Sequence, residues 1–126
     1  MTSIKCRVIV AVSTYVASQG AAIAQDVAGV WLRDNGRSQV RIYSCGDVLC
    51  GSIAWLKDPS GPGRIGQRVF FDMTPQGDGK WKGKAFNPED SKTYTGMMSL
   101  SGNSLTTAGC VFGGLICKSA KWSRVH

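Results

Sequence analysis

The chain has a single histidine, His126, which is its last residue. Because no other histidine occurs, the chain offers no Ser-His or Cys-His pair for nucleophilic catalysis in its interior. The neighbouring carboxylates Glu89 and Asp90 follow Asn87 and Pro88, a pattern typical of a turn, so we expect them to hydrogen-bond the loop. Glycine motifs that bind phosphates or dinucleotides are also missing. We therefore expect that the protein is not an enzyme.

Long apolar runs are missing too. Polar residues between positions 13 and 20 interrupt the apolar stretch near the amino terminus too often for a membrane-spanning helix of about 20 residues. Lys5 and Arg7 precede this stretch and Ala22-Ile23-Ala24 ends it, which is the order of a secretory signal peptide and its cleavage site. We expect a cleavable signal peptide at residues 1–24, with a membrane anchor as the alternative. Residues 25–126 would then form one exported domain, periplasmic or secreted, without stable membrane insertion.

Acidic residues are scarce, since 8 Asp and Glu stand against 15 Lys and Arg for a formal net charge of +7. Loss of Lys5 and Arg7 with the leader would lower this charge to +5. A positive charge favours encounters with anionic surfaces without identifying one, and solubility is the simpler interpretation. We expect no nucleic-acid partner.

Four cysteines follow the leader, at Cys45, Cys50, Cys110 and Cys117. An even number in an exported chain predicts two disulfides, for which three pairings are possible. A two-residue Gly113-Gly114 turn would pair Phe112 with Leu115 and set Cys110 opposite Cys117, and the same logic sets Cys45 opposite Cys50. We therefore favour the two local pairs over bridges between the hairpins. The spacing is wider than Cys-x-x-Cys and no histidine lies nearby, so we expect neither a metal site nor a cofactor.

No segment after the leader has a sustained helical apolar period. Short β-branched and aromatic segments alternate with Gly, Asn, Asp and Pro turn signals instead. The expected strands are residues 30–33, 38–45, 49–57, 67–73, 81–87, 93–101, 104–112 and 115–125. Eight strands with short connections favour an all-β fold, a small closed or nearly closed antiparallel up-and-down barrel without exposed edges.

Alternation along the strands assigns side chains to the two faces of the sheet. Val40 and Ile42 should share one face, and Lys82 and Lys84 should lie outside. Residues on the inward positions of two later strands could line a ligand pocket, and the candidates are Trp81, Tyr94 and Met98. Small residues occupy further inward positions, at Gly83, Ala85 and Gly96; they are either bend points or room for a ligand, and we favour bending.

The first and last strands of a closed barrel become neighbours. Trp31 opens the domain and Arg124 lies near its end. We expect the Arg124 guanidinium to stack on the Trp31 ring in a cation–π contact that closes the barrel.

The chain from residue 29 to residue 125 resembles a family of exported bacterial proteins known as domain of unknown function 2147. The resemblance rests on six segments in order: GVWLRDNG (29–36), CGDVLCG (45–51), AWLKDP (54–59), GDGKWKG (77–83), NPEDSKTY (87–94) and WSRV (122–125). Many members have a longer segment before the Gly-Asp-Gly turn and no cysteine pairs, and they carry Gly where this chain has Ser91. The resemblance implies export and a compact β fold without implying a reaction. More loosely, the Gly-x-Trp opening and the terminal Arg are similar to lipocalin and avidin-like barrels.

The sequence leaves two functions open. The first is a periplasmic barrel that binds a small apolar or amphipathic ligand in the pocket named above. The second is a protein-interaction or inhibitor-like accessory module of the cell envelope, without a ligand pocket, that acts through loops such as residues 58–66 and 87–91.

Overall fold

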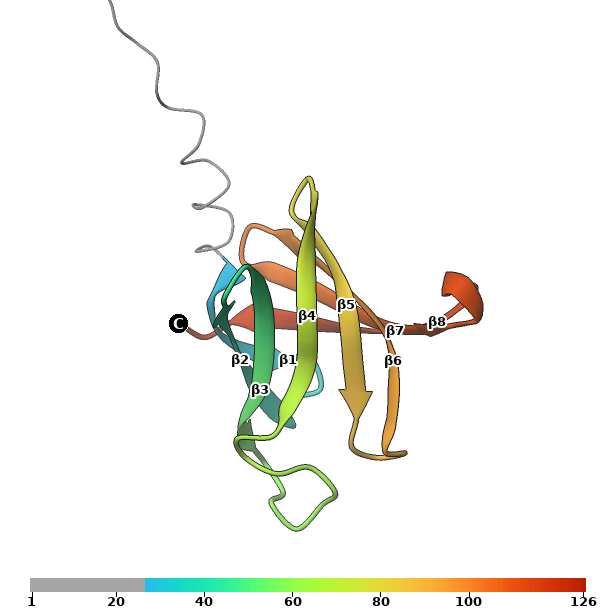
Figure 1. Cartoon of the computed structure of the whole chain (residues 1–126). Helices are drawn as coiled ribbons and strands as arrows, with labels where there is room; N and C mark the ends of the chain where they lie inside the picture. Colours follow the sequence, from blue (N-terminus) through green and yellow to red (C-terminus); the bar gives the residue numbers. More distant parts are fainter. Residues whose placement is uncertain (1–26) are drawn as a thin grey trace, which may run out of the picture.

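Period-two side-chain patterns alternate with glycine-bearing turns, and the chain accordingly folds as a meander of antiparallel strands (Figure 1). The computed structural model describes residues 27–126, and the predicted signal peptide lies outside them. The strands are β1 (Gly29–Arg33), β2 (Ser38–Cys45), β3 (Val48–Leu56), β4 (Arg68–Gly77), β5 (Lys80–Asn87), β6 (Lys92–Ser101), β7 (Ser104–Val111) and β8 (Ile116–Arg124). A 3-10 turn, η1 (Phe112–Gly114), joins the last two. Each strand pairs with the next and β8 returns to β1, so the predicted closed eight-stranded barrel is confirmed.

The barrel closes where β1 pairs with β8. Trp31 stands opposite Arg124, and the guanidinium carbon of Arg124 lies 4.4 Å from the centroid of the Trp31 ring. Arg124 also donates a hydrogen bond from Nη1 to the carbonyl oxygen of Ala28 at 3.3 Å. The backbone amide of Val30 donates to the carbonyl oxygen of His126 at 2.7 Å and continues the seam past the last strand. The stacking contact is the one that the sequence predicts at this seam.

Large apolar side chains from all parts of the sheet fill the barrel. Trp31, Met73 and Leu105 are fully buried. The alternation predicted for β2 is confirmed, because Val40 and Ile42 are buried while the intervening Arg41 is exposed. The rest of the core cluster is Val27, Val40, Ile42, Leu49, Ile53, Val69, Phe70, Trp81, Met98 and Trp122.

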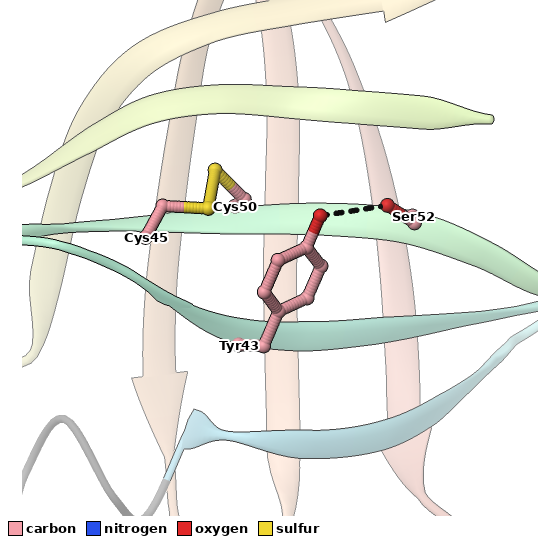
Figure 2. Close-up of a disulfide and its surroundings, with 4 residues drawn as sticks. All are labelled: Tyr43, Cys45, Cys50 and Ser52. Carbon is pink, nitrogen blue, oxygen red and sulfur yellow. Dashed lines mark hydrogen bonds between the residues drawn. A yellow bond between two sulfur atoms is a disulfide. The ribbon is translucent and has the colours of Figure 1, made fainter. Parts of the chain in front are cut away.

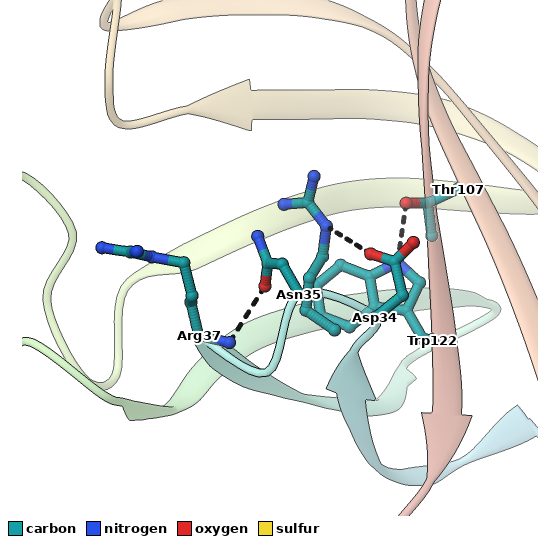
Figure 3. A network of polar contacts seen from close by, with 6 residues as sticks. Asp34, Asn35, Arg37, Thr107 and Trp122 are labelled. Carbon is teal, nitrogen blue, oxygen red and sulfur yellow. Dashed lines mark hydrogen bonds and ion pairs between the residues drawn. The ribbon is translucent and has the colours of Figure 1, made fainter.

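The polar atom of the Trp122 ring, its indole nitrogen, has a hydrogen-bond partner inside the core. Its indole Nε1 donates a 2.9 Å hydrogen bond to the hydroxyl of Thr107, which is itself buried (Figure 3). The pairing offsets the desolvation of both groups. The β1–β2 turn lies nearby in the same view, where the side-chain oxygen of Asn35 accepts a hydrogen bond from the Arg37 amide at 2.9 Å.

Strand β4 is longer than predicted. The sequence predicts an end at Met73, yet the strand continues to Gly77 and includes Pro75, which cannot donate a ladder hydrogen bond. Register shifts between Phe71 and Thr74 and again after Pro75 accommodate the proline. Asp72 adopts a positive φ of 52° in the first of these irregularities.

Both predicted disulfides, Cys45–Cys50 and Cys110–Cys117, are present. Cys110 and Cys117 stand directly opposite each other as expected. The predicted register of the other pair is wrong, because Cys45 stands opposite Val48 and Cys50 opposite Tyr43. The two cysteines are diagonal neighbours on one face, with Cα atoms 5.9 Å apart (Figure 2).

Candidate functional site

Two of the three predicted ligand residues belong to the packed core. Trp81 on β5 stands opposite Met98 on β6, and both side chains are buried. Tyr94 stands further along β6, opposite Ala85, and is only half-buried. The structure therefore brings Trp81 and Met98 together and places Tyr94 apart from them.

Tyr94 instead lines a shallow, open depression of about 430 Å³ on β5 and β6. Its other lining residues are Lys82, Gly83, Lys84, Thr93 and Thr95. Neither Trp81 nor Met98 reaches this depression. That these three residues bind a ligand stays a prediction.

The small inward residues of β5 and β6 allow neighbouring backbones to approach closely. A Cβ on Gly83 would lie 2.4 Å from the carbonyl oxygen of Phe71 and 2.5 Å from that of Asp72. A Cβ on Gly96 would lie 2.8 Å from the carbonyl carbon of Lys84. Glycine at these two positions is thus required by the curvature of the sheet, which is the favoured of the two interpretations.

Asp90 organises the turn between β5 and β6. Its carboxylate accepts hydrogen bonds from the Tyr94 hydroxyl and, at 3.0 Å, from the Lys92 backbone amide. The Tyr94 hydrogen bond is the main cause that lowers the pKa of Asp90, and the same contact raises the pKa of Tyr94. Glu89 contributes its backbone amide, which donates to the side-chain oxygen of Asn87 at 3.0 Å. These contacts give the pair the loop-fixing role expected from the sequence.

We predict that Tyr94→Phe raises the pKa of Asp90 toward the ordinary aspartate value, because the variant removes the hydroxyl that favours the ionised carboxylate. Since the folded-state pKa is depressed, the turn gains stability above the unfolded-state pKa and loses it as pH falls through the folded-state value. Carboxyl chemical shifts followed by NMR across the acidic range measure this. Tyr43→Phe is the matched control and should leave Asp90 unchanged, whereas the same Asp90 pKa in both variants would refute the assignment.

Within residues 27–126, no three His, Cys, Asp or Glu side chains gather to hold a metal ion. In the same part of the chain, no helix is long and apolar enough to cross a membrane.

Three exposed large apolar side chains, among them the two most exposed of residues 27–126, gather where β7 turns into β8. Phe112, Leu115 and Ile116 are 75%, 85% and 58% exposed. We call residues 112–116 the apolar tip. Strand β6 pairs with β7 only as far as Thr95 and Cys110, beyond which β7 and β8 continue alone and project from the barrel (Figure 1).

Local conformation fixes the apolar tip in this outward position. The predicted two-residue turn is wrong, because β7 ends at Val111 and β8 begins at Ile116, which leaves a four-residue loop. Phe112 adopts a positive φ of 54°, which turns the chain out of the ladder before the glycines. The Leu115 amide closes the loop by donating to the carbonyl oxygen of Phe112 at 3.3 Å. The Cys110–Cys117 disulfide clamps the loop at its base.

Sequence reasoning missed this feature, although a signal for it exists. In the sequence, the run Val-Phe-Gly-Gly-Leu-Ile predicts strand pairing around a turn and nothing about exposure. Two central glycines imply a turn, and a turn lies at the end of a sheet, where neighbouring strands cannot cover large side chains. An apolar run on both sides of a double glycine therefore predicts exposed apolar residues.

Lysines cover the outer face of β5–β8, beside the apolar tip. Cross-strand register aligns Lys84 with Thr95, Cys110 and Cys117, so that this lysine shares the row of the clamping disulfide. On the same face of the sheet, the next row carries Lys82 and the one after it carries Lys80 and Lys121. None of these three rows contains an acidic residue. We call this surface the basic face.

Comparison with known proteins identifies the family. Residues 29–124 match the family model described as "uncharacterized protein conserved in bacteria (DUF2147)". The chain belongs to this family. The match covers the whole of the DUF2147 barrel from β1 to β8.

A solved structure shares the fold of this DUF2147 protein. It is a protein from the human pathogen Helicobacter pylori described as belonging to the lipocalin family. The two align with a TM-score of 0.62 and 18% sequence identity, over 79% of this chain and 83% of that chain. The likeness shows a lipocalin-like barrel fold. No curated protein matches the chain in sequence.

Proposed function

We propose that this DUF2147 protein is a non-enzymatic accessory module of the bacterial envelope that binds its partner with the apolar tip. The observation that carries the proposal is the exposure of Phe112, Leu115 and Ile116 at one clamped turn. Contiguous exposed apolar residues mark interaction sites, whereas single ones need no explanation. A disulfide and a fixed turn also reduce the entropy that a flexible loop would lose on binding.

The proposed location is the periplasm. Two disulfides in a bacterial protein indicate an oxidising environment, and the basic, apolar and small-residue order of residues 1–24 supports export into one. Basic residues of the leader would then be absent from the working protein.

A small apolar or amphipathic ligand is the second candidate. The lipocalin-like fold and the depression beside Tyr94 favour it. A ligand inside the barrel, however, would have to displace closely packed side chains such as Trp81 and Met98. The cost would be several kcal/mol, similar to that of creating a cavity in a protein core. The apolar tip requires no such rearrangement.

Site-specific photo-crosslinking in the producing bacterium tests the proposed function. A photoreactive phenylalanine analogue replaces Leu115 in the apolar tip or, as a matched control, Ile65, which is 62% exposed in the loop between β3 and β4. We expect adducts with envelope components from position 115 and few from position 65. Equal labelling at both positions, or none at 115, would overturn the proposal.

A further inference from the structure

We propose that the partner of the apolar tip is the surface of an anionic phospholipid bilayer; this inference rests on the proposed function and names its partner. The tip would enter the boundary between headgroups and acyl chains, while the lysines set back from it would remain among the headgroup phosphates. The contact is peripheral and reversible, because one turn buries far less apolar surface than a spanning segment.

The apolar part of this surface has the form of a wedge. Phe112 and Leu115 are at the turn itself and Ile116 is the first residue of β8, so all three leave the barrel at its outermost point. Because these side chains are exposed, they are accessible to a surface that the hairpin meets. Transfer of such side chains from water into an apolar medium is favourable and needs no shaped pocket on the partner.

The positive charges of nearby lysines lie at a distance from the apolar tip that matches the depth of the headgroup phosphates in a bilayer. Lys118 is exposed and lies two residues beyond Ile116 on β8, about 7 Å along the strand at the usual rise. Interfacial segments bury their apolar parts about 5–10 Å into the headgroup boundary, so Lys118 would reach the phosphates when Ile116 is immersed. Lys84 lies in the row of Cys117, which is one residue nearer the tip than Lys118.

The lysines are available for such a contact. Lys82, Lys84 and Lys118 are all exposed. Among residues 27–126, Arg33 and Asp34 form an ion pair, and none of these three lysines takes part in one. The acidic residues Glu89 and Asp90 belong to the β5–β6 turn, which runs in a different direction from the β7–β8 hairpin that carries the apolar tip (Figure 1).

Charge also favours a bilayer over a second copy of this chain. Two copies meeting through their tips would bring two basic faces toward each other, which is unfavourable. An anionic bilayer has an apolar interior that the apolar tip can enter and a negative surface that the lysines behind the tip can contact.

Vesicle sedimentation tests the inference. The full chain is expressed with its leader, purified, and mixed with vesicles of phosphatidylcholine containing phosphatidylglycerol, or of phosphatidylcholine alone. We expect binding to the anionic vesicles that weakens with added salt and is much lower on neutral ones. Any leader that is retained is common to all variants, so the comparison between variants reports on the folded domain.

The apolar arm of the experiment uses Phe112→Ser with Leu115→Ser. We expect the double variant to lose about tenfold in vesicle affinity per side chain, hence about a hundredfold. Both residues are exposed, so thermal unfolding should be unchanged. Ile65→Ser is the matched control, since it removes an exposed apolar side chain elsewhere and should bind as wild type does.

The charge arm uses Lys84→Gln with Lys118→Gln, and we expect about fivefold weaker binding per lysine on anionic vesicles. Lys57→Gln, an exposed lysine just after β3, is its control. Absence of binding to anionic vesicles at low salt, or binding that the tip variant leaves unchanged, would overturn the inference. In that event, protein adducts from position 115 would leave the proposed function standing, and their absence would end both.

Discussion

Trp31→Ala will lower the free energy of unfolding by about 3–5 kcal/mol, the usual cost of removing a fully buried tryptophan. Trp31 lies at the seam, so the variant loses more than core volume. It also removes the platform on which Arg124 stacks at 4.4 Å and the indole hydrogen bond to the Val27 carbonyl oxygen at 2.9 Å. Chemical denaturation followed by circular dichroism measures the difference.

Trp55→Ala is the matched control for this experiment. Trp55 lies on β3 and is 39% exposed, so its removal leaves no enclosed cavity and should cost about 1 kcal/mol or less. Similar losses in the two variants would mean that Trp31 does not occupy the centre of the seam. A loss at Trp31 alone supports closure of the barrel through β1 and β8.

The second large effect is expected at Gly83. Gly83→Ala will destabilise the protein by about 1–3 kcal/mol, because the new Cβ would lie 2.4 Å and 2.5 Å from two carbonyl oxygens of β4. Those oxygens belong to Phe71 and Asp72, at the irregularity where β4 leaves its regular register. Backbone cannot rotate aside as a side chain can, so the strands must separate.

Gly61→Ala is the control for backbone crowding. A Cβ at Gly61 would lie 3.6 Å from the Asp58 carbonyl oxygen, an ordinary contact, so we expect a change within about 0.5 kcal/mol. The free energy of unfolding from denaturant titration separates the two variants. A Gly83→Ala protein as stable as wild type would show that the sheet has room at this position, as the ligand interpretation of the small residues requires.

Strand positions could be predicted from the sequence because their signals are local. Alternation at Val40 and Ile42 and turns such as Asn35-Gly36 depend on neighbouring residues alone. The continuation of β4 through Pro75 could not be predicted, because it depends on the partner strand accepting a bulge there. The diagonal Cys45–Cys50 pair has a different, local origin. The turn between β2 and β3 uses two residues, whereas directly opposed cysteines would need a loop of four.

The candidate site was harder to predict than the fold. Whether an inward glycine such as Gly83 makes room for a ligand depends on how closely the next strand approaches, which no local pattern encodes. Composition at the tip gives apolar residues around two glycines, but exposure arises only because β6 stops pairing at Thr95 while β7 and β8 continue. The basic face likewise comes from the alignment of four strands, β5 to β8, although the sequence predicts that Lys82 and Lys84 point outward.

The most direct test of the account is paramagnetic broadening in NMR spectra of the protein bound to anionic bilayer nanodiscs that carry spin-labelled lipid. The account predicts strong broadening of the backbone amides of residues 112–116, with the indole N–H signals of the interior Trp81 and Trp122 unaffected. Broadening of those indole signals while the tip amides stay sharp would place the lipid inside the barrel and contradict it.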